Sequence, residues 1–280
     1  MRKSHKLFYY CNDFWMKEIP LHKILQMSGV RAKKSLGQHF LVDINIAEKI
    51  ASALQNENKG TVIEIGPGMG VLTDMLLGKH ECFRAIELDT ESVAYLKNKH
   101  ADAEDWVINA DFLKYNLSEI EGNISVIGNF PYYISSQIFF KVLEFSYKVD
   151  EVVCMIQKEV AERIASPPGK KQYGLLSVLL QAYYEIEYLF TVHEHCFSPA
   201  PKVKSAVIRL KRNATQNLNC DKDMFFKVVK MTFNQRRKTI RNSLKAAFPN
   251  LGEHELLTKR PEQLNVGQFE TLVNWLSNQQ

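Results

Sequence analysis

The chain has 280 residues, of which 45% are hydrophobic and 24% are charged, and its formal net charge is +5. This composition is typical of a globular protein with a large core and excludes a disordered or fibrous chain. The five cysteines are scattered without a Cys-x-x-Cys pair, which disfavours a zinc site and a disulfide framework and favours a reducing compartment. Because no apolar run approaches the length of a membrane span, we expect a cytoplasmic protein without membrane contact.

The first residues differ in character from the rest of the chain. Residues 1–6 are basic, and the short apolar run Leu7-Phe8-Tyr9-Tyr10 that follows is interrupted by Asn12 and Asp13. No small-residue cleavage site follows, so the pattern does not predict a signal peptide. We therefore treat residues 1–30 as an N-terminal extension, either a docking segment or codons read through from an incorrect upstream start.

Helical and extended patterns alternate along residues 31–212. Asp43 and Thr90 are typical N-caps, for helices over residues 44–54 and up to residue 99. Further helices are expected at residues 71–77, 135–145, 157–164 and 173–184. Apolar and β-branched runs predict strands at residues 61–65, 83–87, 106–109, 124–127, 151–156, 186–192 and 205–210, the last two as an antiparallel pair. This alternation predicts an α/β fold with a doubly wound sheet.

The C-terminal part reads as a small all-helical domain. Residues 213–221 are polar and unpatterned and are interpreted as a linker. Helical patterns then occur at residues 224–233, 238–247, 253–257 and 266–276, so the predicted domain covers residues 222–280.

Positive charge is concentrated around this linker. Residues 202–245 contain 13 Lys or Arg residues and two acidic residues, which favours a polyanionic partner over a solvated basic face. Because nucleic acids are bound through their phosphates, the candidate phosphate contacts are Lys202, Lys204, Arg236, Arg237 and Lys238.

A glycine-rich turn follows the first sheet strand. The stretch Gly66-Pro67-Gly68-Met69-Gly70 allows close approach of the backbone to a ligand. Glu87 ends the next strand, about 20 residues on, where an acid can bind both hydroxyls of a ribose. The Gly-x-Gly-x-Gly spacing differs from that of pyrophosphate binders, so a nucleoside without phosphate, such as S-adenosylmethionine, fits better. Asp111, after the third strand, can accept from an adenine amino group.

The tetrapeptide Asn129-Phe130-Pro131-Tyr132 follows the fourth predicted strand, at the sheet edge where open α/β folds place their chemistry. The exocyclic amine of a nucleobase is a poor nucleophile, because its lone pair is delocalised into the ring. The Asn129 side-chain oxygen and the Pro131 carbonyl can accept its N–H bonds and localise that lone pair. Tyr132 offers a face on which the base can stack. A strand-ending turn is the alternative interpretation.

These motifs together resemble the ribosomal small-subunit RNA adenine dimethyltransferases, from about Arg31 to the C-terminus. The resemblance includes residues 34–41, 86–89, 109–111, 128–135, 197–205 and 233–239. It implies a class I S-adenosylmethionine-dependent methyltransferase fold with a helical C-terminal RNA-binding domain. It also implies dimethylation of N6 on two adjacent adenines in the 3′-terminal hairpin of small-subunit (16S) rRNA, with a role in 30S subunit biogenesis.

The resemblance also assigns roles to residues of this chain. It implies a cofactor site formed by His39, Leu41, Gly66, Gly68, Glu87, Asp111 and Asn129. It implies that the target base is handled by Asn129, Pro131, Tyr132 and Phe197, with Phe197 stacking on a flipped adenine. Three residues depart from the usual pattern: Phe130, Tyr133, which stands where Asn is usual and can alter the pocket rim, and His39.

Two other functions remain open from the sequence. The sister group of this family methylates an adenine of large-subunit rRNA and confers macrolide resistance. It shares the glycine turn and the Asn-x-Pro-Tyr motif. The chain can also be a non-catalytic ribosome-assembly factor that docks on the 30S pre-ribosomal particle. His193-Glu194-His195 is not expected to bind a metal, because two loop histidines without further ligands rarely form a site. We expect a monomer.

Overall fold

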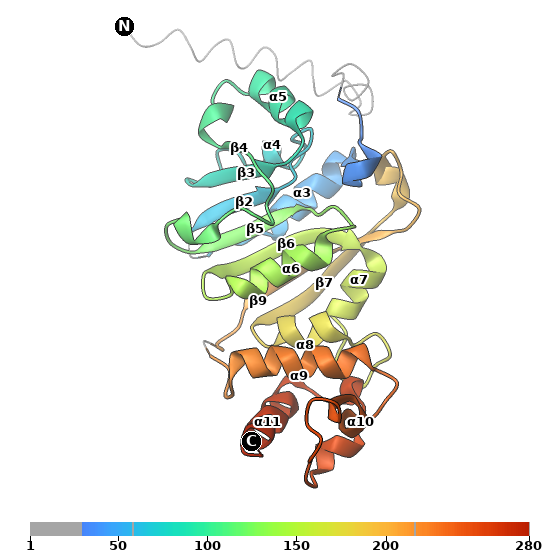
Figure 1. Cartoon of the computed structure of the whole chain (residues 1–280). Helices are drawn as coiled ribbons and strands as arrows, with labels where there is room; N and C mark the ends of the chain where they lie inside the picture. Colours follow the sequence, from blue (N-terminus) through green and yellow to red (C-terminus); the bar gives the residue numbers. More distant parts are fainter. Residues whose placement is uncertain (1–29, 58, 216, 280) are drawn as a thin grey trace, which may run out of the picture.

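A single twisted sheet forms the centre of the computed structural model, which describes residues 30–57, 59–215 and 217–279. The strand order is β4-β3-β2-β5-β6-β9-β7 (Figure 1). The first five strands in this order are mutually parallel, and β9 is antiparallel to both β6 and β7. The bounds are β2 (Thr61–Ile65), β3 (Phe83–Glu87), β4 (Val107–Asn109), β5 (Ile124–Asn129), β6 (Val149–Gln157), β7 (Tyr184–Val192) and β9 (Ser205–Arg212). The predicted doubly wound sheet and its final antiparallel pair are confirmed.

Helices cover both faces of the sheet because successive strand residues point to opposite sides. Val62 and Ile127 pack in the cluster that contains the buried residues of α3 (Ile44–Ala53), α4 (Thr73–Leu76) and α5 (Thr90–Lys99). Their neighbours Ile63 and Val126 belong to the opposite cluster. That cluster contains the buried residues of α6 (Ser135–Glu144), α7 (Lys158–Ile164) and α8 (Leu175–Gln181).

Some predicted helix ends were wrong. Asp43 caps α3 as expected, accepting from the backbone N–H of Asn45 at 3.0 Å. Asp89, however, caps α5 in place of Thr90, which is the first helical residue. The predicted helix over residues 173–184 is shorter, because Gly174 is its extended N-cap and Tyr184 already belongs to β7.

The C-terminal helices continue the core of the sheet. They are α9 (Lys222–Asn234), α10 (Ile240–Leu244) and α11 (Val266–Ser277), with 3-10 turns at Glu255–Thr258, where an α-helix was predicted, and at Pro261–Gln263. Phe225 of α9 and Phe269 of α11 are fully buried in the same apolar cluster as Val152 of β6 and Leu210 of β9. Figure 1 shows α8 between the sheet and α9.

The domain boundaries remain predictions. The chain divides by element type near the predicted linker, but the apolar cluster is continuous across it. The predicted N-terminal extension lies outside the described residues except for Val30, which is buried with Phe40 and Met69.

A two-stranded ribbon joins two segments that are distant in sequence. It pairs β1 (Phe40–Leu41) with β8 (Phe197–Ser198) in antiparallel fashion, with Leu41 opposite Phe197. The pairing holds the segment before α3 against the β7–β9 connection, next to the carboxyl ends of the parallel strands.

Candidate active site

A pocket opens at the carboxyl ends of β2, β3 and β5, the position where open α/β sheets bind ligands. It brings together all the predicted cofactor and catalytic residues except Phe197. The predicted residues that line it are His39, Leu41, Gly66, Gly68, Glu87, Asp111, Asn129, Pro131 and Tyr132. Their grouping follows from the topology, because parallel strands present their carboxyl ends at one edge.

The side chain of Asn129 is held in one orientation. Its Nδ2 donates to the main-chain carbonyl of His39 at 2.9 Å, so the amide nitrogen is occupied and Oδ1 is the end left to accept. Gly128 allows β5 to reach this position, because a Cβ there would lie 2.5 Å from the carbonyl oxygen of Ile65. Asn129 can therefore act as a fixed hydrogen-bond acceptor in the pocket.

Tyr132 is fixed by contacts on two sides. Its hydroxyl forms a 2.5 Å hydrogen bond with Ser205 Oγ of β9, a fully buried group. Its ring stacks with the His39 imidazole, with the centroids 5.6 Å apart. The His39 ring in turn donates from Nδ1 to the carbonyl of Pro199 at 2.8 Å. Burial raises the pKa of Tyr132, although the Ser205 hydrogen bond opposes this, so the phenol stays neutral.

The glycine turn and Glu87 also line the pocket. Gly66 and Gly68 both have left-handed φ angles, of +65° and +55°, which other residues rarely adopt. The Glu87 carboxylate accepts from the backbone N–H groups of Gly68 at 3.0 Å and Asp89 at 2.8 Å. Burial raises the pKa of Glu87, and these two N–H donors counteract the shift. Each carboxylate oxygen keeps a lone pair that can accept from a ribose hydroxyl.

Asp111 lines the pocket just after the end of β4. Its Oδ1 accepts from the backbone N–H of Leu113 at 3.0 Å, which fixes the side chain. Its Oδ2 lies 3.9 Å from the Lys114 ammonium, whose side chain is almost fully exposed. The carboxylate therefore has acceptor capacity for an amino group of a ligand.

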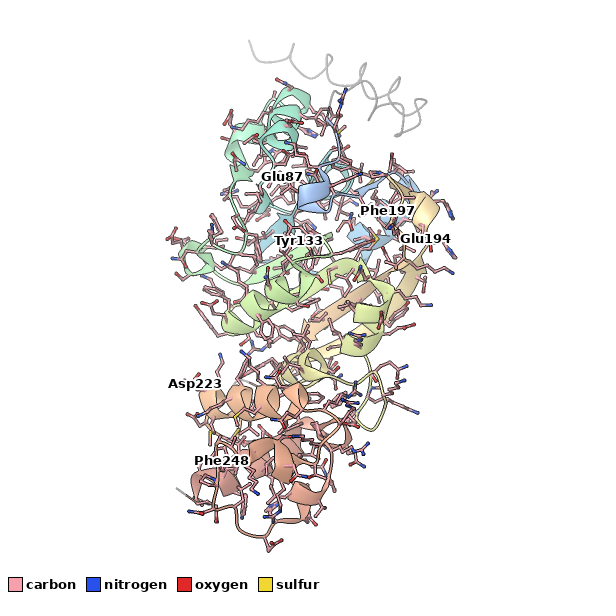
Figure 2. All side chains as sticks on the ribbon, turned by 45° about the vertical axis from the view of Figure 1, so that its right-hand side comes forward. Glu87, Tyr133, Glu194, Phe197, Asp223 and Phe248 are labelled. Atoms are coloured by element: carbon pink, nitrogen blue, oxygen red, sulfur yellow. The ribbon has the colours of Figure 1, made fainter. Side chains whose placement is uncertain are left out.

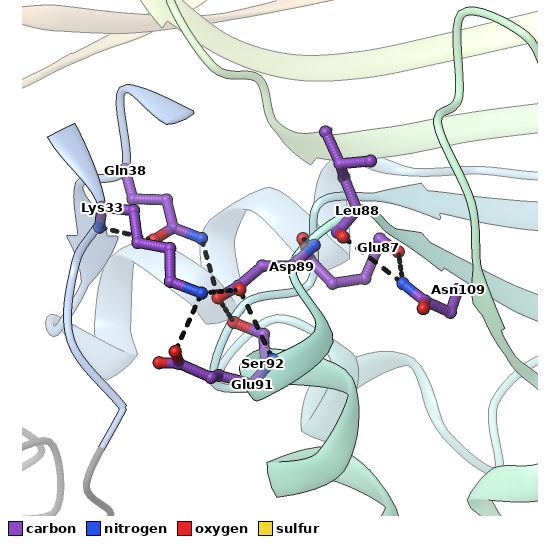
Figure 3. A network of polar contacts seen from close by, with 8 residues as sticks. All are labelled: Lys33, Gln38, Glu87, Leu88, Asp89, Glu91, Ser92 and Asn109. Atoms are coloured by element: carbon purple, nitrogen blue, oxygen red, sulfur yellow. Dashed lines mark hydrogen bonds and ion pairs between the residues drawn. The ribbon is translucent and has the colours of Figure 1, made fainter. Parts of the chain in front are cut away.

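A polar network ties the segment before β1 to the acidic end of β3 (Figure 3). The Lys33 ammonium lies 2.5 Å from Asp89 Oδ1 and 3.0 Å from the Glu91 carboxylate. The Gln38 amide and the Ser92 hydroxyl both donate to Asp89 Oδ2. Burial opposes ionisation of Asp89, but these hydrogen bonds outweigh it and lower the pKa of its carboxyl group.

Phe197 does not line the pocket. Its side chain is 4% exposed and packs in the apolar cluster under α3, opposite Leu41 in the β1–β8 ribbon. Figure 2 shows Phe197 to one side of Glu87 and Tyr133. The predicted stacking of this ring on a base therefore stays a prediction.

The sequence comparisons identify the family. Residues 29–277 match the family described as ribosomal RNA adenine dimethylase. A relative from Bacteroides thetaiotaomicron, named ribosomal RNA small subunit methyltransferase A, is 54% identical over 253 residues, covering 89% of this chain and 95% of the relative. A relative of the same name from Flavobacterium johnsoniae is 52% identical over 251 residues, covering 88% and 96%. The chain belongs to the ribosomal RNA adenine dimethylase family. The predicted family, enzyme class and Rossmann-like methyltransferase fold are thereby confirmed.

Two solved structures share the fold of this dimethylase. A dimethyladenosine transferase from Plasmodium falciparum superposes with a TM-score of 0.73 at 21% identity, covering 86% of this chain and 98% of the other. The 23S rRNA methyltransferase ErmE superposes with a TM-score of 0.62 at 26% identity, covering 84% and 99%. The higher identities to small-subunit methyltransferases favour that branch over the large-subunit alternative.

Two residues that line the pocket of the dimethylase, Leu88 and Glu64, were not predicted as site residues. Leu88 is 48% exposed and lines the pocket beside Glu87, where it offers an apolar surface to a ring. Tyr133, which was expected at the rim, also lines the pocket and is 55% exposed. Glu64 is almost fully buried, and it accepts from the Thr73 hydroxyl at 2.7 Å. Burial raises the pKa of Glu64 to about 8, although the Thr73 hydrogen bond lowers it. This burial was not predicted, because an acidic side chain is usually exposed to solvent.

The predicted phosphate contacts lie outside the pocket. Lys202 and Lys204 are exposed on the connection between β8 and β9, and Arg237 and Lys238 are exposed between α9 and α10. Arg236 is only partly exposed, with its guanidinium donating to the Lys171 carbonyl.

Among the described residues, no helix is both long and apolar enough to cross a membrane. The same residues contain no group of three or more His, Cys, Asp or Glu side chains that could hold a metal ion.

Proposed function

We propose that this dimethylase transfers methyl groups from S-adenosylmethionine to N6 of two adjacent adenines in the 3′-terminal hairpin of small-subunit rRNA. The observation that carries the proposal is the orientation of Asn129, whose amide nitrogen is bound by the His39 carbonyl. An acceptor at the end of β5, in a pocket with a glycine turn and a buried Glu87, suits the methylation of an exocyclic amine.

The residues of the glycine-turn side fit a nucleoside cofactor. The Glu87 carboxylate would accept from the ribose hydroxyls, and its two backbone N–H partners hold it in place for that role. Asp111 would accept from the adenine amino group, with Leu88 against the ring. When bound, the cofactor supplies a methyl group on a sulfonium centre. The protein's task is to place that group in line with the attacking nitrogen.

Asn129 and Pro131 would activate the target amine. The Asn129 Oδ1 and the Pro131 carbonyl accept its two N–H bonds, which localises the lone pair on nitrogen. With the cofactor bound, the nitrogen would bond to the methyl carbon as the carbon–sulfur bond breaks, and the methylated amine would release a proton to water. A flipped adenine needs a stacking surface, and Tyr132, held by Ser205, supplies one.

The exposed basic side chains of two clusters would bind the RNA backbone. Lys202 and Lys204 lie on the connection between β8 and β9, and Arg237 and Lys238 lie between α9 and α10. Contacts to phosphate fix the orientation of an RNA without reading its sequence, so specificity rests on which adenines reach the pocket. The proposal retains the predictions of a cytoplasmic, monomeric protein that acts on the 30S pre-ribosomal particle.

Methyl transfer from labelled S-adenosylmethionine to 30S particles that lack the modification tests the proposal, with 50S particles as the control. We expect label as N6,N6-dimethyladenine in small-subunit RNA only. Label on 50S particles or on free large-subunit RNA would move the chain to the resistance group. Absence of label on both, with the cofactor bound, would favour a non-catalytic assembly factor.

A further inference from the structure

The loop between α7 and α8, residues 165–174, is fastened to the C-terminal helices. The guanidinium of Arg236 donates to the carbonyl of Lys171. The backbone N–H of Gly169 donates to the carbonyl of Glu262 at 2.7 Å. These contacts link a loop of the methyltransferase sheet to two separate segments that follow β9, so the loop is held in a defined position.

An aromatic contact anchors the end of the same loop. Tyr173 is fully buried, and its ring meets the ring of Phe233 of α9 edge-on, with the centroids 6.4 Å apart. Ser177 of α8 accepts from the backbone N–H of Gly174 at 2.9 Å, which fixes the exit of the loop. The part of the loop that remains on the surface is therefore the stretch before Tyr173.

This exposed stretch adds two free cations to the predicted basic surface. Lys170 and Lys171 are both exposed, and neither forms an ion pair within the part of the chain that the structure describes. The same holds for Arg237 and Lys238, which follow the tethering residue Arg236 directly. Arg236 differs from them, because its Nε lies 3.9 Å from a carboxylate oxygen of Glu262 and its guanidinium is engaged by the loop.

The loop lies between the two basic clusters predicted from the sequence. The backbone N–H of Lys158, the first residue of α7, donates to the carbonyl of Lys204 at 2.9 Å, so α7 begins beside the first cluster. It ends at the loop that contacts the second cluster. Figure 1 shows the β7–β9 connection, α7, this loop and the α9–α10 connection one below the other along one edge of the molecule.

The cations of α7 itself do not add to the surface charge. Lys158 lies 3.6 Å from Glu162, and Arg163 forms an ion pair with Glu159. Each positive side chain is thus matched by an acid one helical turn away. The unmatched charge between the two clusters comes from the loop.

We propose that Lys170 and Lys171 contact phosphates of the RNA substrate, so that the loop connects the two basic clusters. Arg236 is then a positioning residue that holds this loop on the C-terminal helices. This inference rests on the proposed function, because the partner is the same RNA. It also revises the role predicted for Arg236, whose guanidinium is already engaged with protein atoms.

The inference is tested with a double substitution, Lys170→Gln with Lys171→Gln, assayed for binding to unmodified 30S particles between about 50 and 200 mM salt. We expect weaker binding. The plot of the logarithm of the binding constant against the logarithm of the salt concentration should have a slope that is shallower by about 1 to 2, as for the loss of two phosphate contacts. Binding of S-adenosylmethionine should be unchanged. The matched control is Lys59→Gln with Lys79→Gln, two exposed lysines in the connections that precede β2 and β3.

The positioning role of Arg236 is tested by a double-mutant cycle. If Arg236 acts through the loop, Arg236→Ala should weaken 30S binding in the wild-type background but have little further effect in the Lys170→Gln/Lys171→Gln background. Full additivity would show that Arg236 contacts RNA by itself.

The outcomes separate this inference from the proposed function. Wild-type methylation of 30S particles with unchanged affinity and salt slope in the lysine variant would overturn the inference alone. If the wild type does not methylate 30S particles but the lysine variant still binds them more weakly, the proposed reaction would be overturned and the inferred RNA-binding surface would be supported. Absence of 30S binding by the wild type would overturn the inference.

Discussion

The Nδ2 of Asn129 and the main-chain carbonyl of His39 are 2.9 Å apart, and this hydrogen bond determines which end of the Asn129 amide remains available. A free amide can rotate and offer either a donor or an acceptor. Here the donor is bound by backbone, so the acceptor role does not depend on the identity of the residue 39 side chain. An Asn at position 39 would leave the contact in place.

Replacement of Asn129 by Ala should reduce methyl transfer by about 100-fold or more, by analogy with the loss of one preorganised hydrogen-bonding group in other enzymes. The measurement is single-turnover transfer to 30S particles at saturating cofactor. Asn98→Ala, at an exposed position on α5, is the matched control and should be inert. Turnover near the wild-type rate in Asn129→Ala would remove the acceptor from the mechanism.

Removal of the hydroxyl of Ser205 should slow the reaction through Tyr132, because the phenol loses its 2.5 Å partner. We expect Ser205→Ala to lower kcat by roughly 2- to 13-fold, which corresponds to a net hydrogen bond of about 0.5–1.5 kcal/mol. In a Tyr132→Phe background the same substitution should have little further effect. Equal effects in both backgrounds would mean that Ser205 acts on the protein in some other way.

Lys33→Gln should weaken the binding of S-adenosylmethionine several-fold while kcat at saturating cofactor stays unchanged. Asp89 lies two residues after Glu87 and donates its backbone N–H to the Glu87 carboxylate, so the contacts that hold Asp89 also order the acid that we propose binds the ribose. Lys34→Gln is the control, since Lys34 is exposed and outside the network. Equal affinities for the cofactor in the two variants would contradict this coupling.

Stability should fall as the pH rises from about 4.5 to about 8, because of Glu64. Its pKa is about 8 in the folded protein against an ordinary value of 4.5, so in this range the folded state binds more protons than the unfolded state. The contribution is fully present below pH 4.5 and has a limiting slope of about 1.4 kcal/mol per pH unit. Glu64→Gln should lack this pH-dependent contribution. The free energy of unfolding in urea, measured at pH 5 and at pH 8, should therefore differ between the variant and the wild type by an amount that grows with pH. A constant difference would contradict the burial effect.

The sequence predicted the parts of the site whose chemistry is local. The β-branched run before Gly66 and the apolar run before Asn129 each specify a strand and the turn that follows it, and parallel pairing then brings their ends together. The partners that hold the site side chains in position come from distant parts of the chain. Tyr132 and Ser205 are 73 residues apart, and Lys33 and Asp89 are 56 apart. No periodicity encodes such pairs, because they arise only when the tertiary fold is formed.

Phe197 illustrates a second limit of prediction from the sequence. A Phe before a Ser-Pro turn is compatible both with an aromatic surface for a base and with a core residue. The two roles differ only in which way the strand faces, and that is decided by the pairing of Phe197 with Leu41. In this structure the ring lies on the core side.

The continuous apolar cluster that joins β6 and β9 to α9 and α11 through α8 has a consequence for protein engineering. Chimeras between members of this family that exchange only the segment after Arg212 would set the new α9 against a foreign α8 surface. To keep the side-chain packing intact, the exchanged segment has to include α8 together with the C-terminal helices. Since the loop before α8 comes with it, such a graft would also transfer Lys170 and Lys171, so that RNA affinity and core packing would be inherited together.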